Sequence, residues 1–127
     1  MKILRNIFLL SIPIFILHGM EEYITGFTQV DPIFLWVFRP LLDMSVNQAT
    51  FLVFQIMLGV LLIVSALLIL GEKWQRRMII IPGLLYIFEF HHLYEAIIRK
   101  TYYPGLITAL FFPFVAFFFW KAYFKNS

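Results

Sequence analysis

Residues 49–70, ATFLVFQIMLGVLLIVSALLIL, form one apolar run that contains no charged side chain. The hydrocarbon core of a bilayer is about 30 Å thick, and a helix needs roughly 20 mostly apolar residues to cross it. A run of this length and composition therefore predicts a transmembrane helix.

The rest of the chain also has the composition of a membrane protein. Hydrophobic residues make up 62% of the 127 residues and charged residues 13%, and the mean hydropathy is +0.89. Soluble domains carry about 25% charged residues, so most of this chain is expected to lie in lipid. We predict an all-α integral membrane four-helix bundle, one domain over residues 1–127, with spans at approximately 3–23, 49–70, 78–98 and 103–124.

The long connection between the first two spans holds a shorter apolar run that follows Asp31 and Pro32. An acidic residue followed by proline is typical of a helix N-cap and first turn. Because the run is too short to cross a bilayer, we expect an interfacial or re-entrant helix, which either anchors the chain through Trp36 or covers a site.

The ten basic residues are divided unequally between the two sides of the expected bundle. Seven lie near the termini and in the connection at residues 71–77, and three lie on the other side. Basic segments stay in the cytoplasm, so we expect both termini there, in the plasma membrane of a bacterium. The positive charge thus indicates the orientation of the chain in the membrane and not an affinity for nucleic acid. The expected partners are membrane lipid and a lipid-soluble substrate.

All three histidines and four of the seven acidic residues lie inside the expected spans. At about 100° per residue, they form one polar stripe on the first span and another on the third, and such stripes face a bundle interior. The two spans run in the same direction, and each stripe lies beyond the midpoint of its span. Both stripes are therefore expected at the same depth in the bilayer. The first stripe is His18, Glu21 and Glu22, and the second is Glu89, His91, His92 and Glu95.

Histidine and glutamate spaced three or four residues apart on helices are ligands for zinc, iron or manganese. A charged residue near the centre of a span costs about 2.5 to 3.5 kcal/mol, which favours a functional reason for the stripes. With no cysteine in the chain, a thiolate site is excluded. The predicted metal ligands are His18, Glu22, Glu89 and His92, with His91 as a further candidate. Glu21 and Glu95 are the predicted catalytic residues, each as a general base or a further ligand.

The string His18-Gly19-Met20-Glu21-Glu22 resembles the signature of the HXXEE-motif family of integral membrane proteins. The later features that agree with the family pattern are His92 on the third span, Arg99, and then Tyr103, Pro104, Gly105 and Thr108. The resemblance extends over essentially the whole chain and implies a four-helix topology. It implies no established activity, although the histidines and acids of the family have suggested a metal-dependent membrane enzyme.

Three functions remain open on the sequence. A metal-dependent enzyme would hydrolyse a lipid-soluble ester or amide, as a hydrolase, or oxidise an acyl chain, as an oxidoreductase. A proton-coupled transporter or channel would use the same groups as a relay, and one four-helix unit would then need to form a homo-oligomer. In a purely structural role, the polar groups would pair with one another to hold the helices together. Sequence selects neither the metal nor the substrate.

Overall fold

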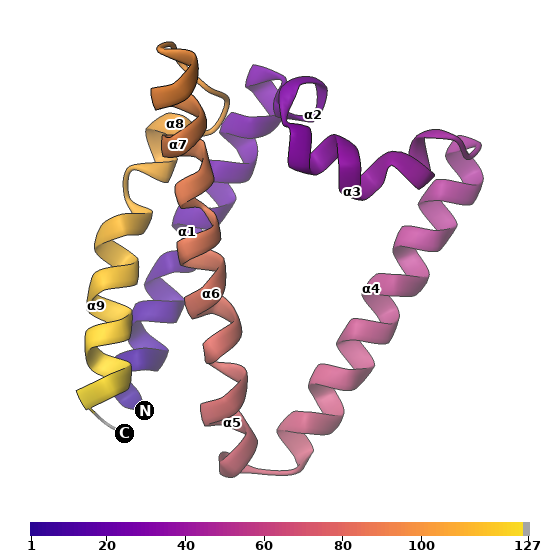
Figure 1. Cartoon of the computed structure of the whole chain (residues 1–127). Coiled ribbons are helices and arrows are strands. Elements are labelled where there is room, and N and C mark those ends of the chain that lie inside the picture. Colours follow the sequence, from indigo (N-terminus) through magenta and orange to yellow (C-terminus); the bar gives the residue numbers. More distant parts are fainter. Residues whose placement is uncertain (126–127) are drawn as a thin grey trace. The chain divides into compact units, whose positions relative to one another are not determined.

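The computed structural model describes residues 1–125 as a succession of α-helices, with no strand in that range (Figure 1). The expected all-α class is therefore confirmed. The helices form two compact units, one from residues 1–28 and from residue 79 onward, the other from residues 29–78. The assignment of the chain to one domain stays a prediction. The expected cytoplasmic C-terminus includes residues 126–127, which lie outside the described residues.

The first unit begins with α1 (Lys2–Thr25), which contains Pro13 and matches the first expected span. The helix ends at Gly26, whose φ of 80° is left-handed and whose N–H donates to the Glu22 carbonyl. Glycine adopts this backbone without a steric penalty and is the usual residue after the last turn of a helix.

The third expected span, at 78–98, is not one uninterrupted helix. In the first unit it consists of α6 (Ile80–Phe88) and α7 (Phe90–Arg99), which meet at Glu89. The His92 N–H donates to the Glu89 carbonyl, three residues back, while the Phe88 carbonyl accepts a hydrogen bond from the His91 imidazole. A side chain that enters the backbone ladder in this way interrupts a helix. The backbone of Glu89 stays right-handed, with φ −64° and ψ −12°.

The fourth expected span consists of α8 (Leu106–Ala109) and α9 (Phe112–Lys125), and α9 packs against both α1 and α6 (Figure 1). Gly83 allows α6 to approach α9 closely, because a Cβ there would lie 2.5 Å from the Phe119 ring. Small residues have this use between membrane helices. The buried core of the unit is Leu4, Tyr86, Ala109, Phe112, Ala116, Phe119 and Ala122.

The second unit contains the connection predicted to hold a short helix. After α2 (Phe27–Val30), which leads into this unit, α3 (Pro32–Leu42) begins where expected, and the Asp31 carboxylate accepts the Phe34 N–H at 2.7 Å. The helix continues past the apolar run to Leu42, although Pro40 lies inside it. The N-cap is therefore confirmed, and an interfacial or re-entrant position stays a prediction.

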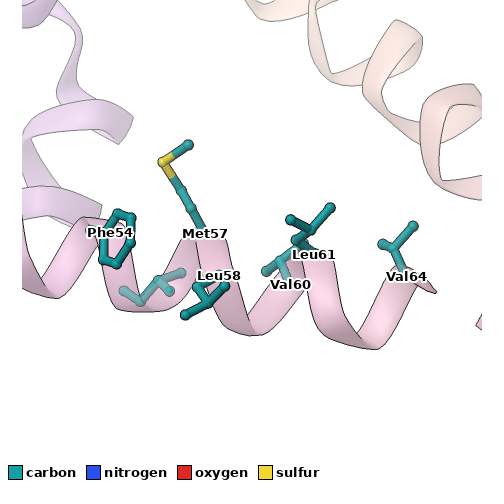
Figure 2. A pocket seen from close by; sticks show the side chains of 7 residues that line it. Phe54, Met57, Leu58, Val60, Leu61 and Val64 are labelled. Atoms are coloured by element: carbon teal, nitrogen blue, oxygen red, sulfur yellow. The ribbon is translucent and has the colours of Figure 1, made fainter. Parts of the chain in front are cut away.

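The same unit contains α4 (Val46–Ile69), followed by α5 (Glu72–Met78). A capping box of Ser45 and Gln48 starts α4, and none of its 24 residues is buried. Its exposed apolar side chains include Phe54, Met57 and Leu61 (Figure 2). Water would not stabilise such a helix, whereas lipid would.

Three helices of the described chain are long and apolar enough to cross a membrane. They are Lys2–Thr25, Val46–Ile69 and, with α8 and α9 taken together, Leu106–Lys125. These lengths and compositions are those of a membrane protein.

Candidate metal centre

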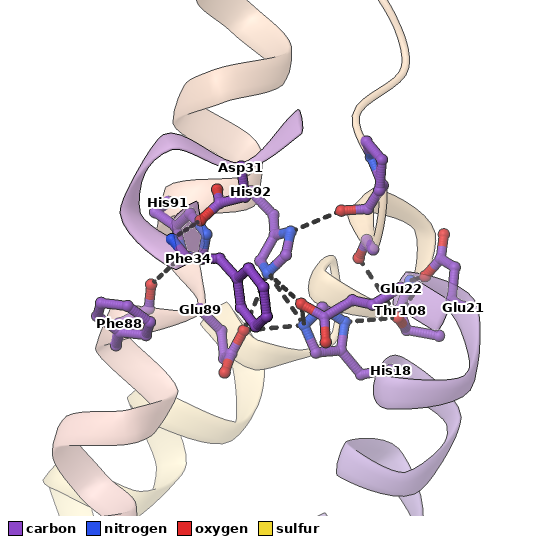
Figure 3. A network of polar contacts seen from close by, with 12 residues as sticks. His18, Glu21, Glu22, Asp31, Phe34, Phe88, Glu89, His91, His92 and Thr108 are labelled. Carbon is purple, nitrogen blue, oxygen red and sulfur yellow. Dashed lines mark hydrogen bonds and ion pairs between the residues drawn. The ribbon is translucent and has the colours of Figure 1, made fainter. Parts of the chain in front are cut away.

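Four side chains of the first unit converge on one point. His18 and Glu22 extend from α1, Glu89 lies at the α6–α7 junction, and His92 extends from α7 (Figure 3). One nitrogen or oxygen atom from each lies within 4.8 Å of all the others. These four residues are called the metal group below.

Local helix geometry accounts for each half of the metal group. His18 and Glu22 are one turn apart on α1 and share a face, as residues four positions apart do. Glu89 and His92 are three positions apart, where the chain passes from α6 into α7. The sequence predicts that the two polar stripes lie at the same depth, and two residues of each stripe converge in the structure.

His92 presents its Nε2 atom to the metal group. Its other ring nitrogen, Nδ1, lies 2.8 Å from the carbonyl oxygen of Pro104. A carbonyl only accepts, so Nδ1 carries the hydrogen and, in the neutral ring, Nε2 carries the lone pair. That Nε2 atom lies 3.2 Å from Glu22 Oε1 and 3.2 Å from Glu89 Oε2.

His18 is oriented in the same way through a hydroxyl group. Its Nδ1 atom lies 2.8 Å from Thr108 Oγ1, and Thr108 Oγ1 in turn contacts Glu21 Oε2 and the Gly105 carbonyl. Both of the latter only accept, so the single hydroxyl hydrogen is used there and Thr108 Oγ1 must accept from His18. In the neutral His18 ring, Nε2 therefore also carries its lone pair toward the metal group.

The spacing within the metal group matches a coordination polyhedron. His18 Nε2 lies 2.8 Å from Glu89 Oε2, 3.1 Å from His92 Nε2 and 3.5 Å from Glu22 Oε1. Bonds of about 2.0 to 2.2 Å to one ion place neighbouring ligand atoms roughly 2.8 to 3.6 Å apart, in octahedral or tetrahedral geometry. Four acceptor atoms this close repel one another unless protons or a cation lie among them. The donor set thus fits a divalent ion.

Glu21 lies outside the metal group, beside Thr108 (Figure 3), and accepts four hydrogen bonds. Its Oε1 accepts from the Tyr102 hydroxyl at 2.7 Å and the Ile107 N–H at 3.0 Å. Its Oε2 accepts from the Thr108 N–H at 2.9 Å and from the Thr108 hydroxyl. The pKa of the Tyr102 phenol lies above its ordinary value, because the hydroxyl is partly desolvated and donates to this carboxylate. Tyr102 therefore remains a donor.

Gly105 brings the backbone against both imidazole rings. A Cβ at this position would lie 2.8 Å from His18 Cε1 and 2.9 Å from His92 Cε1 and Nδ1. The φ of 86° is also left-handed, so both the close approach and the backbone conformation require glycine. Residues 100–108, called the supporting connection below, thus contact both rings on the side away from the metal group.

Aromatic rings shield the two histidines. His18 lies edge-on to Phe112, with centroids 5.3 Å apart, and the Phe27 ring lies 5.2 Å from His92. The side chains of His18 and His92 are 3% and 0% exposed, against 24% for Glu22. The metal group is therefore mainly dry, and Glu22 is its most accessible member.

Two further predicted site residues lie elsewhere. His91 Nδ1 donates to the Phe88 carbonyl at 2.9 Å, and His91 does not belong to the metal group. Glu95 accepts from Arg99 Nε at 3.0 Å, one turn along α7, where the Arg99 side chain is exposed. The sequence pattern placed both on the polar face of α7, but of the α7 residues on that face only His92 belongs to the metal group.

The string from His18 to Glu22 thus contributes two members of the metal group and one residue that supports it. The sequence model of a family described as proteins of unknown function with an HXXEE motif matches residues 9–120. The chain belongs to this family. No curated protein and no solved structure matches the chain. In this HXXEE protein, the first glutamate of the motif contacts the supporting connection and the second faces the histidines.

No sequence pattern assigns the supporting connection a role at the site. Tyr102, Gly105 and Thr108 lie near the start of the fourth span, and only agreement with the family pattern singled out the last two. No spacing rule relates them to His18, because the contacts join residues 90 positions apart in the chain.

Proposed function

We propose that this HXXEE protein binds one divalent metal ion at its metal group. The observation that carries the proposal is that both imidazoles donate from Nδ1 to outside partners and turn Nε2 toward the two carboxylates. Histidine ligands in metal sites usually make such an outer hydrogen bond, which fixes the tautomer and the ring orientation.

Charge supports a divalent ion as well. Two neutral imidazoles and two carboxylates carry a net charge of −2, which a divalent ion balances. Uncompensated charge in a dry membrane interior is costly, so this balance favours occupancy. Nitrogen and oxygen ligands without sulfur suit zinc, iron or manganese.

The reaction that this arrangement favours is metal-dependent hydrolysis of a lipid-soluble ester or amide. Di-metal oxidation centres in helical bundles use four glutamates and two histidines, more than this group supplies. Catalytic zinc sites instead have three protein ligands and one open position, and the ion acts as a Lewis acid on the carbonyl. We assign His18, His92 and Glu89 as the ligands.

Glu22 is then the general base. It is the most exposed carboxylate of the metal group, at 24% against 13% for Glu89, and lies farther from His18 Nε2 than Glu89 does. A carboxylate beside the open position takes a proton from the attacking water. The water oxygen bonds to the carbonyl carbon, the ester or amide bond breaks, and the proton passes to the leaving group.

Membrane topology completes the proposal. We infer that four helices cross the membrane and pack as a bundle. The fourth crossing, in addition to the three long helices, is α6 and α7 taken together, because the right-handed backbone at Glu89 allows α7 to continue in the direction of α6. Both termini are assigned to the cytoplasm on the distribution of basic residues. Reporter fusions after residue 127 and within residues 71–77 test this, and activity of either reporter outside the cytoplasm would contradict it.

Metal content of protein purified in detergent without chelator tests the centre. The parent is expected to hold about one equivalent of metal, and His92→Gln to hold none, because the amide keeps a donor for the Pro104 carbonyl but offers no imidazole nitrogen. His91→Gln is the matched control. It keeps a donor for the Phe88 carbonyl and is expected to retain the metal.

Three outcomes would count against the metal centre. A parent without metal, or equal metal in the parent and His92→Gln, would contradict it directly. A metal-free parent that moves protons into liposomes, and loses this activity in His92→Gln, would support a proton-coupled carrier instead.

If metal is present, hydrolysis of fluorogenic lipid esters by the parent but not by Glu22→Gln tests the reaction.

A further inference from the structure

The supporting connection contacts the two histidines and also donates four hydrogen bonds to Glu21. Glu21 accepts hydrogen bonds from Tyr102, Ile107 and Thr108, so both of its oxygens are used. A carboxylate occupied in this way is neither placed to bind the ion nor free to take a proton from water. Its surroundings therefore indicate a different role from that of Glu22.

We propose that Glu21 and Thr108 are positioning residues that hold His18 as the Nδ1–H tautomer, with Nε2 directed at the ion. The inference rests on the proposed metal centre and adds to it the device that orients one of its ligands. It replaces the general-base or ligand role that the sequence suggests for Glu21.

The direction of each hydrogen bond carries the argument. Thr108 has one hydroxyl hydrogen, and Glu21 Oε2 is placed to receive it. The Thr108 oxygen then accepts from His18 Nδ1 at 2.8 Å, and this requires a hydrogen on that nitrogen. Without the Thr108 hydroxyl, His18 Nδ1 loses this hydrogen-bond partner, and the Nε2–H tautomer, which cannot bind metal through Nε2, becomes competitive.

The carboxylate of Glu21 is needed in its charged, acceptor-only form. Two backbone N–H groups, from Ile107 and Thr108, point at it together with two hydroxyl groups. A glutamine would turn an NH₂ group toward at least one of these donors, leaving donor against donor. The first turn of α8 and the Thr108 hydroxyl would then shift together.

The test combines metal affinity with the protonation of the His18 ring. Thr108→Val keeps the shape and the backbone N–H but removes the hydroxyl, and Thr108→Ser restores it. Thr101→Val, an exposed threonine of the same connection, is the matched control. Zinc affinity is measured by competition with a chelator, and the ring nitrogens are followed by ¹⁵N NMR of histidine-labelled protein at a pH where imidazole is neutral.

Thr108→Val and Glu21→Gln are each expected to weaken zinc binding about 10- to 100-fold, the usual effect of removing an outer partner of a ligand. In metal-free protein, Nδ1 of His18 should carry a hydrogen in the parent and should lose it at least in part in both variants. Thr108→Ser and Thr101→Val should behave like the parent. A purely structural role would lower stability without changing the tautomer.

The outcomes separate this inference from the metal centre itself. If the parent binds zinc and Thr108→Val binds it equally well with the same tautomer, the positioning role is wrong and the metal centre stands. If cobalt loaded into Thr108→Val keeps the absorption spectrum of the parent while Glu21→Gln shows the loss of a ligand, Glu21 is a ligand and the inference is overturned. If the parent binds no metal, the metal centre fails, and the parent tautomer, read by NMR without any variant, still decides the hydrogen-bond assignment.

Discussion

The carboxylates of the metal group and the supporting connection contact opposite nitrogen atoms of the same two imidazole rings. On one side, Glu22 and Glu89 present acceptor oxygens to the Nε2 atoms. On the other, Pro104 and Thr108 accept hydrogens from the Nδ1 atoms. Two adjacent glutamates, Glu21 and Glu22, therefore serve different sides of the same rings, because consecutive helical residues point about 100° apart.

Gly105→Ala should have the largest effect, because the change pushes the supporting connection into the metal group. The new Cβ would meet both rings at 2.8 to 2.9 Å, and the backbone there is left-handed. We expect loss of metal binding and destabilisation of roughly 1 to 3 kcal/mol from overpacking, with a similar amount from the backbone. Thermal unfolding in detergent and metal content measure the two effects.

Gly19→Ala is the control for that change. Gly19 lies beside His18, yet a Cβ there has nothing within 4 Å. Alanine should leave metal binding intact and raise helix stability by up to about 1 kcal/mol. Equal loss of metal in the two variants would mean that the close approach of Gly105 is not what orients the rings.

Glu22→Gln should separate the effect of the metal group on stability from its role in hydrolysis. Glu22 shares the site with Glu89, and the removal of one negative charge relieves repulsion in metal-free protein. With chelator present we expect stability equal to or above that of the parent, and without chelator we expect the metal to be retained but hydrolysis to be lost. In a purely structural site the sign reverses, since an unpaired His92 would cost about 1 to 3 kcal/mol. Unfolding with chelator decides between the two signs.

Tyr102→Phe should weaken the supporting connection only slightly. The change removes one of four donors to Glu21 and leaves the Thr108 hydroxyl in place. A hydrogen bond to a charged group contributes about 1.5 to 3 kcal/mol, and less where it is exposed, as here. We expect zinc affinity to fall by less than in Thr108→Val. A larger fall would mean that Tyr102, rather than Thr108, is the main support.

Glu95→Gln should have the smallest effect. Glu95 pairs with Arg99, whose side chain is 41% exposed, and such pairs contribute about 0 to 1 kcal/mol. Metal content, zinc affinity and hydrolysis are expected to match those of the parent. Loss of hydrolysis with normal metal content would restore the catalytic role that the sequence predicts for Glu95.

Much of the site follows from helical periodicity. The i, i+4 pair of His18 and Glu22 and the i, i+3 pair of Glu89 and His92 each share a helix face whatever the tertiary structure. Hydropathy placed both pairs at one depth, and the structure confirms that they converge. Periodicity could not exclude His91, because its ring binds the Phe88 carbonyl of its own helix, which the pattern of polar residues does not show.

Composition and the fixed repeat of the helix were enough to predict the all-helical class, helices apolar enough to cross a membrane, and the two polar pairs. Tertiary structure alone decided which nitrogen of each imidazole faces the carboxylates. That choice depends on Pro104, Gly105 and Thr108, which reach the rings from another helix and a loop. Contacts between distant segments depend on how helices pack, and no local repeat encodes them.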